Sequence, residues 1–137
     1  MPITLNPGIQ RLQLQHNNIQ AVDAALGFYA QLQYVDLSHN QLISLPDRGF
    51  IQQKKLVELD LSKNKIVKVL NGTFDGLKNI YSLINSGKLL KVSHGGLFFH
   101  IKSAQQLDLR QNTIKPINQL RLLAWISSVF YFLTSIT

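Results

Sequence analysis

Few side chains in this sequence have the type and spacing that catalysis or metal binding requires. Cysteine is absent from the 137 residues, so neither a disulfide framework nor a thiolate metal site can form. His16 and His39 stand 23 residues apart, and two imidazoles without an obvious third ligand make a poor zinc site. We also find no nucleophile elbow, phosphate-binding glycine loop or pair of catalytic acids. The sequence therefore predicts no enzyme, no cofactor and no metal site.

The most regular feature of the chain is a repeated phrase. It occurs as IQRLQLQHNNI from Ile9, LQYVDLSHNQL from Leu32, LVELDLSKNKI from Leu56 and AQQLDLRQNTI from Ala104. The asparagines shared by these copies stand 23, 24 and 48 residues apart and are Asn17, Asn40, Asn64 and Asn112. A period in this range predicts a solenoid of stacked units.

Apolar residues keep fixed positions within each copy. Counted from the first apolar residue, they fall at positions 1, 4, 6, 11 and 14, which in the second copy are Leu32, Val35, Leu37, Leu42 and Leu45. Positions 4 and 6 alternate with polar neighbours, as in a half-buried strand. Stacked copies should therefore pair into one parallel sheet, with positions 4 and 6 inward and positions 3 and 5 outward.

Two side-chain series are expected to hold the stack together. Position 9 carries an amide that donates and accepts, so it can satisfy backbone groups where the chain leaves the strand. We interpret Asn17, Asn40, Asn64 and Asn112 as a buried structural ladder rather than an active site. An aromatic residue in the second half of each copy predicts a second spine in the core, formed by Phe28, Phe50, Phe74 and Phe98.

The copy over residues 80–103 is degenerate. Position 6 is Asn85, and Leu89 and Val92 fit positions 11 and 14 only if one residue is lost before them. We expect local irregularity there. The predicted organisation is a remnant of an N-terminal cap junction at 1–8, five repeats over 9–119 and a hydrophobic tail at 120–137. The repeats are 9–31, 32–55, 56–79, the degenerate 80–103 and a partial 104–119.

These residues resemble the leucine-rich repeat family, and the form LxxLxLxxNxLxxLxxxxFxxLxx is similar to its typical extracellular subtype. The phrasing is most similar to insect cell-surface members, the group that includes Tartan, Capricious and Toll-like receptors. The resemblance implies an α/β repeat solenoid: a curved array with a concave parallel sheet and an irregular or short-helical convex side. It also implies a non-catalytic protein-protein interaction module of an adhesion protein or receptor, located outside the cell or at the plasma membrane.

The chain lacks the cysteine-rich caps that extracellular members commonly carry, so it resembles an internal fragment or an incomplete product. Two other interpretations stay open. One is a cytoplasmic scaffold of the same fold, and the other is a truncated or mispredicted product with little independent function.

The outward strand positions define the surface on which the resemblance implies ligand binding, which we call the concave face. Its predicted columns are Arg11, Tyr34, Glu58, Ser82 and Gln106 at position 3, and Gln13, Asp36, Asp60, Ile84 and Asp108 at position 5. Tyr34, Arg11 and Arg110 are the expected anchors, because Tyr and Arg are enriched at binding hot spots. The alternative is an ordinary solvated face, since Asp in the phrase LDLS is common in the family.

Fourteen Lys and Arg against seven Asp and Glu give a formal charge of +7, which favours anionic partners. Stacking should bring Lys65, Lys68, Lys88 and Lys91 into a basic ridge on one edge. Such a ridge could bind a sulfated glycan or an acidic protein, although an ordinary charged surface is the alternative. Nucleic acid is not an expected partner, because no known nucleic-acid-binding fold accompanies the charge.

Two further segments bear on the cellular compartment. Asn71-Gly72-Thr73 is a glycosylation sequon outside the strand region, so a glycan on Asn71 would leave the concave face free. Residues 122–137 are uncharged, and their length is just below the usual minimum of about 17 for a membrane span. This tail could be a truncated membrane anchor or a buried closing helix.

Overall fold

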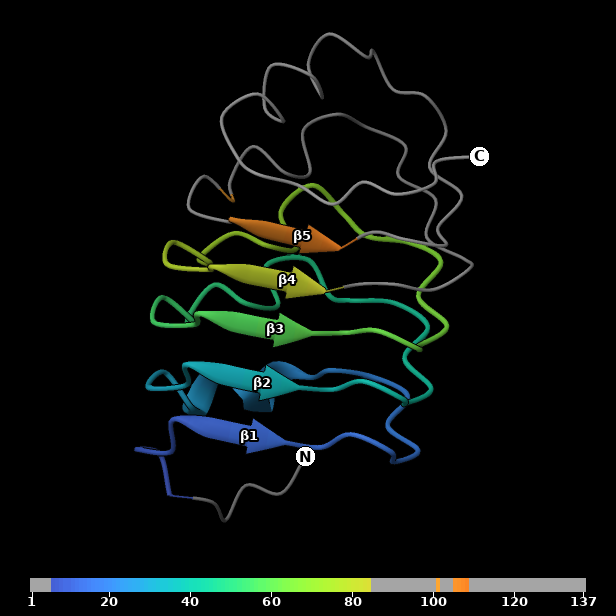
Figure 1. Ribbon diagram of the computed structural model, residues 1–137, viewed down its shortest axis with the longest axis horizontal. Helices are drawn as coiled ribbons and strands as arrows, with labels where there is room; N and C mark the ends of the chain where they lie inside the picture. The colour runs from blue at the N-terminus through green and yellow to red at the C-terminus, as the bar shows by residue number, and fades with distance from the viewer. Residues whose placement is uncertain (1–5, 85–100, 102–104, 109–137) are drawn as a thin grey trace, which may run out of the picture.

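The computed structural model describes residues 6–84, 101 and 105–108. Five short strands lie one above another as a ladder, and each neighbouring pair is parallel and consecutive in sequence (Figure 1). The strands are β1 (Arg11–Gln13), β2 (Tyr34–Asp36), β3 (Glu58–Asp60), β4 (Ser82–Ile84) and β5 (Gln106–Asp108). This sheet of successive units confirms the predicted repeat solenoid.

The register of the sheet follows the repeat numbering. Leu12 lies opposite Val35, Val35 opposite Leu59 and Leu59 opposite Leu83, so position 4 forms one inward column. All four side chains are buried. A slip of one residue would turn this column to solvent, and the burial of position 4 therefore fixes the register.

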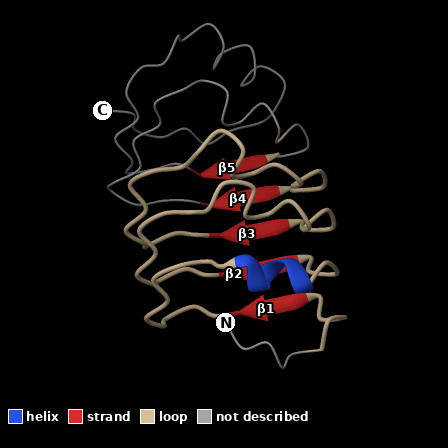
Figure 2. Cartoon of the chain, turned by 180° about the vertical axis from the view of Figure 1, so that it is seen from behind, coloured by secondary structure: helices blue, strands red, loops and turns tan. Residues whose placement is uncertain are grey.

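The core lies between the inner face of the sheet and the segments that return the chain to the next strand. Figure 2 shows these return segments from behind, with the helix η1 (Ala24–Phe28) in front of β1 and β2. Asp23 caps η1 by accepting a hydrogen bond from the backbone N–H of Ala25 at 2.9 Å. The later return segments contain turns instead, over residues 47–52 and 71–76. In the described return segments the convex side is thus irregular with one short helix, as predicted.

The asparagine ladder forms at Asn40 and Asn64. The Nδ2 of Asn40 donates to two carbonyls of its own turn, those of Leu37 and Ser38, and to the carbonyl of Leu14 in the preceding repeat at 2.8 Å. Its Oδ1 accepts from the N–H of Ile19 at 3.0 Å. The amide thereby satisfies backbone groups of two repeats at once.

Asn64 repeats this geometry one unit later. Its Nδ2 reaches the carbonyls of its own turn and that of Leu37 at 2.9 Å, and its Oδ1 accepts from the N–H of Leu42 at 3.0 Å. Asn17 differs because it is exposed and bonds only to carbonyls of its own turn. The predicted burial is therefore wrong for Asn17, since no earlier repeat covers it in the part of the chain that the structure describes. Asn112 lies outside the described residues.

The structure places Leu26 in the predicted aromatic spine instead of Phe28. Phe50 and Phe74 are buried and stack with ring centroids 6.1 Å apart, but Phe28 is 66% exposed. The first repeat is one residue shorter than the second, and the prediction followed residue type to Phe28 instead of counting back from Leu32. Leu26 takes the spine position, as the equivalent hydrogen bonds from Tyr29 N to Leu26 O and from Gln53 N to Phe50 O indicate. Phe98 and residues 85–100, where the sequence predicts irregularity, lie outside the described residues.

Candidate protein-binding surface

The concave face carries two columns of side chains from the five strands. Strand pairing places Arg11, Tyr34, Glu58, Ser82 and Gln106 in one column and Gln13, Asp36, Asp60, Ile84 and Asp108 in the other. The structure therefore brings together these residues as the repeat numbering predicts. Ser82 differs from its neighbours because it is buried, so it adds little to the surface.

Two of the three expected anchors touch each other. The guanidinium carbon of Arg11 lies 4.2 Å from the centroid of the Tyr34 ring, within the range of a cation–π contact (about 6 Å). The contact joins β1 to β2 across the column and restrains two side chains that would otherwise be free to rotate. Arg110, the third expected anchor, lies outside the described residues.

Asp36 and Asp60 are half-buried on adjacent strands, and each carboxylate accepts a hydrogen bond from the backbone. One oxygen of Asp36 accepts from the N–H of Ser38 at 2.9 Å, and one oxygen of Asp60 accepts from the N–H of Ser62 at 2.8 Å. These bonds satisfy amides at the end of each strand, which gives the repeated aspartate a structural role. The same bonds hold the carboxylates in a defined orientation for a partner.

Tyr81 is an exposed aromatic residue at the start of β4 that the sequence analysis did not single out. It directly precedes β4, is 44% exposed, and its carbonyl accepts hydrogen bonds from Gln105 and Gln106 at 2.9 and 2.8 Å. Successive side chains of a strand point to opposite faces, so Tyr81 at position 2 belongs to neither of the two columns at positions 3 and 5.

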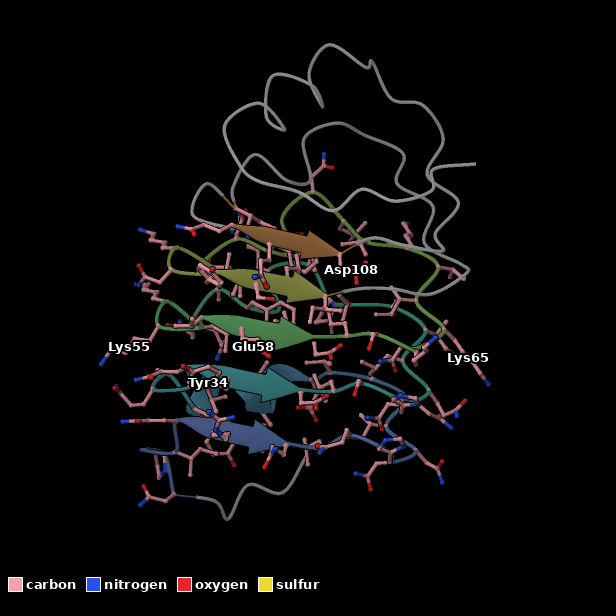
Figure 3. All side chains as sticks on the ribbon, viewed as in Figure 1. Tyr34, Lys55, Glu58, Lys65 and Asp108 are labelled. Carbon is pink, nitrogen blue, oxygen red and sulfur yellow. The ribbon has the colours of Figure 1, made fainter. Side chains whose placement is uncertain are left out.

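Lysines lie at the margins of the sheet rather than on it. Figure 3 shows Lys65 and Lys55 at opposite edges of the molecule, with Tyr34 and Glu58 over the strands between them. Lys65 and Lys68 are both exposed. Lys88 and Lys91, the other members of the predicted ridge, lie outside the described residues.

His16 and His39 are neighbours, as their shared position 8 predicts. Their rings stack with centroids 4.2 Å apart, and both residues have positive φ angles, near 57° and 53°. The next residue at this position, Lys63, has φ 55°, so this left-handed conformation is part of the turn that leads into the asparagine. Within the described part of the chain, no group of three or more His, Cys, Asp or Glu could hold a metal ion.

The glycosylation sequon begins a turn of the third return segment. Asn71 is exposed there, whereas Thr73 is buried and its hydroxyl accepts from the N–H of Leu70 at 3.1 Å. The acceptor asparagine is therefore accessible away from the strands. Among the described residues, no helix is both long and apolar enough to cross a membrane, and the tail 122–137 is outside them.

The stacked strands, the asparagine ladder and the Phe50–Phe74 pair can now be compared with known proteins. The family model described as "Leucine rich repeat" matches residues 7–66 and 30–84, which together cover more than half of the chain. The chain belongs to the leucine-rich repeat family.

Relatives within the leucine-rich repeat family are much longer than this chain. Lumican of Rattus norvegicus is 34% identical over 109 residues, which cover 77% of this chain and 31% of lumican. "Leucine-rich repeats and immunoglobulin-like domains protein 1" of Homo sapiens is 32% identical over 110 residues, covering 80% of this chain and 10% of that protein. Chaoptin of Drosophila melanogaster is 42% identical over 59 residues, 43% of this chain and 4% of chaoptin. The chain thus spans less than a third of each.

Solved leucine-rich repeat structures agree on the fold. The TLR13–ssRNA13 complex matches with a TM-score of 0.68 at 23% identity over 91% of this chain and 21% of that chain. Human 5T4 matches with a TM-score of 0.61 at 19% identity over 83% of this chain and 56% of that chain. At these identities the likeness shows the fold alone.

Proposed function

We propose that this chain is the recognition part of a cell-surface or secreted adhesion protein or receptor, and that it binds a protein ligand on its concave face. The observation that carries the proposal is the restrained Arg11–Tyr34 pair on an exposed sheet face, because Tyr and Arg anchors on a rigid support are typical of binding hot spots. The proposed contact residues are Arg11, Gln13, Tyr34, Asp36, Glu58, Asp60, Gln106, Asp108 and, outside the described residues, Arg110.

The test is a binding screen of the full chain, made multivalent on streptavidin, against purified extracellular domains. Tyr34→Ala should abolish most of the binding to any ligand found, whereas Phe28→Ala should leave it unchanged. Phe28 is a matched control because it is also a solvent-accessible aromatic residue but lies on the return side of the fold. A ligand that is lost with Phe28→Ala and kept with Tyr34→Ala would contradict the proposal.

Nucleic acid is outside the proposed partners, although the TLR13 structure is titled as a complex with ssRNA13. That complex concerns TLR13, and a likeness at 23% identity carries the fold alone. A single-stranded RNA therefore belongs in the same screen as a comparison ligand. Binding of RNA that depends on Tyr34 would replace a protein ligand as the function of this face.

The lysine edge is a second candidate surface, for a sulfated glycan. Lys65 and Lys68 are exposed at the edge where the chain leaves the strands, and the net charge of +7 adds a favourable long-range field. Lys65→Gln with Lys68→Gln should lower the salt concentration that elutes the chain from heparin. The matched control is the pair Lys54→Gln and Lys55→Gln on the opposite edge, which should shift elution less.

Two finer features complete the proposal. Glycosylation of Asn71 would support secretion, and a mobility shift removed by a glycosidase and absent in Asn71→Gln would demonstrate it. Placement in the insect group of Tartan, Capricious and Toll-like receptors is supported by the similarity to Drosophila chaoptin. A longer transcript whose added repeats are more similar to lumican than to that group would contradict this placement.

A further inference from the structure

Acidic and basic side chains are separated in this molecule. All seven acidic residues lie in the described part of the chain, and four of them project from the strands: Asp36, Glu58, Asp60 and Asp108. Arg11 is the only basic residue of the described strands, and every described lysine lies off them. A chain with a formal charge of +7 therefore presents a locally acidic concave face.

Two of these carboxylates oppose each other in the sheet. Asp36 pairs in register with Asp60, and neighbouring strands are about 4.8 Å apart. Like charges directly opposite on paired strands destabilise a sheet, and the bonds to Ser38 and Ser62 keep both carboxylates near this arrangement. A cationic group placed between them would remove the repulsion and gain attraction from both.

The same face already holds one cationic group. The Arg11 guanidinium stacks on Tyr34, next to Glu58 in the same column. An aromatic ring beside carboxylates suits guanidinium and ammonium groups, because the ring face and the carboxylate both attract positive charge.

We propose that the ligand of the concave face is a basic protein segment, whose Lys or Arg side chains lie among Asp36, Glu58 and Asp60 and contact Tyr34. The inference rests on the proposed function and specifies the chemistry of its partner. A single divalent ion fits less well, since the described carboxylates form no group of three that could hold one. A sulfated glycan would be repelled from this face.

The test uses the full chain and a fluorescein-labelled 12-residue peptide of alternating Arg and Ser, followed by fluorescence anisotropy. The chain should bind this peptide despite its own net positive charge, and added salt should weaken the binding. Asp36→Asn with Asp60→Asn should reduce the affinity at least tenfold. The amide oxygen of Asn can still accept from Ser38 and Ser62, so the melting temperature should stay close to that of the parent chain.

Lys65→Gln with Lys68→Gln is the control, and it should leave the affinity unchanged or raise it slightly. Unchanged peptide affinity in the Asp36 and Asp60 double variant would overturn the inference. So would self-association in sedimentation experiments that both double variants abolish, because the basic partner would then be a second copy of this chain. A second peptide, of alternating Glu and Ser, should not compete with the Arg-Ser peptide for binding to the chain.

The two proposals fail in different ways. One outcome is a protein ligand that loses binding with Tyr34→Ala and keeps its affinity with Asp36→Asn and Asp60→Asn. That result would leave the proposed function intact and overturn only the proposal that the ligand is a basic segment. A protein ligand that ignores Tyr34 overturns the proposed function itself.

Discussion

The turn after each strand and the return segment on the convex side differ in how strictly their residue types repeat. In the turn, Asn40 and Asn64 make the same set of hydrogen bonds, each to its own turn and to the repeat before. In the return segment, equivalent core positions hold Leu26, Phe50 and Phe74. Directional bonds that cross between repeats require one residue type, whereas packing requires only apolar volume. The turn therefore repeats more strictly in sequence than the return segment.

The largest expected effect comes from removing a buried rung of the ladder. Asn40→Leu would delete the hydrogen bonds that Asn40 makes to the carbonyls of Leu14, Leu37 and Ser38 and the bond that it accepts from the N–H of Ile19. The N–H of Ile19 would lose its bond to the side chain, whereas the carbonyl of Leu14 would keep the bond from Asn17. We expect a loss of about 4 kcal/mol in the free energy of unfolding, at about 1 kcal/mol for each of these bonds. Urea denaturation of the full chain followed by circular dichroism measures it.

Asn17→Leu is the matched control for this prediction. Asn17 is exposed and bonds only within its own turn, at 3.0 and 3.1 Å. It should lose about 1 kcal/mol or less, as for a solvent-accessible hydrogen bond. Equal losses for Asn17 and Asn40 would mean that contacts between repeats are not what the asparagine contributes.

Gly76→Ala tests whether the return segment tolerates an added side chain at a position where the backbone is closely packed. Gly76 has φ 97°, and an added Cβ would lie 2.5 Å from the carbonyl oxygen of Phe50. Gly76→Ala should therefore destabilise by about 2–3 kcal/mol through backbone strain and a clash that no side-chain rotation relieves. Thermal melting and urea denaturation should agree on this loss.

Gly27→Ala controls for the loss of glycine itself. An added Cβ there meets only the Cγ of Gln52 at 3.8 Å, and Gly27 lies in η1. We expect no destabilisation, or a gain of about 0.5 kcal/mol from reduced chain entropy. If Gly27→Ala were as harmful as Gly76→Ala, the close approach of the Phe50 carbonyl would not be the cause.

A third variant tests the claim that apolar volume is enough in the spine. Leu26 occupies the equivalent position of the first repeat, so Phe50→Leu should cost about 1 kcal/mol, while Phe50→Ala should cost about 3 kcal/mol because of the cavity it leaves. The difference between the two substitutions is the measurement. Similar large losses for both would show that the stacked pair with Phe74 demands an aromatic ring.

The smallest effect is expected for Phe28→Ser. Its side chain is 66% exposed, so the free energy of unfolding should change by no more than about 0.5 kcal/mol. A loss above about 2 kcal/mol in urea denaturation would restore Phe28 to the core and contradict the placement of Leu26 there.

Much of the fold follows from the sequence because its signals are periodic. The spacing of the asparagines gives the stack, and the alternation at positions 4 and 6 gives the register that pairs Arg11 with Tyr34. The misassignment of Phe28 has a simple cause: residue type was followed where chain length mattered. Counting back from Leu32 would have selected Leu26.

The sequence predicted which residues form the columns of the binding surface, but not which contacts their side chains make. Repeat numbering placed Asp36 beside Asp60, yet their bonds to Ser38 and Ser62 depend on side-chain rotation, which periodicity does not encode. The stacking of Arg11 on Tyr34 is of the same kind. Tyr81 was not predicted because it lies at the start of the repeat that departs from the pattern at Asn85, and the interpretation of that repeat rested on its irregular residues.

The asparagine bonds give the array a direction. The side chain of Asn40 holds the N–H of Ile19, and that of Asn64 holds the N–H of Leu42, always reaching toward the amino terminus. The rate at which each of these backbone N–H protons exchanges with solvent therefore measures how often the junction between two repeats opens. Faster exchange at Ile19 than at Leu42 would mean that the array frays from its first repeat inward, and the two rates would measure how firmly successive units are joined.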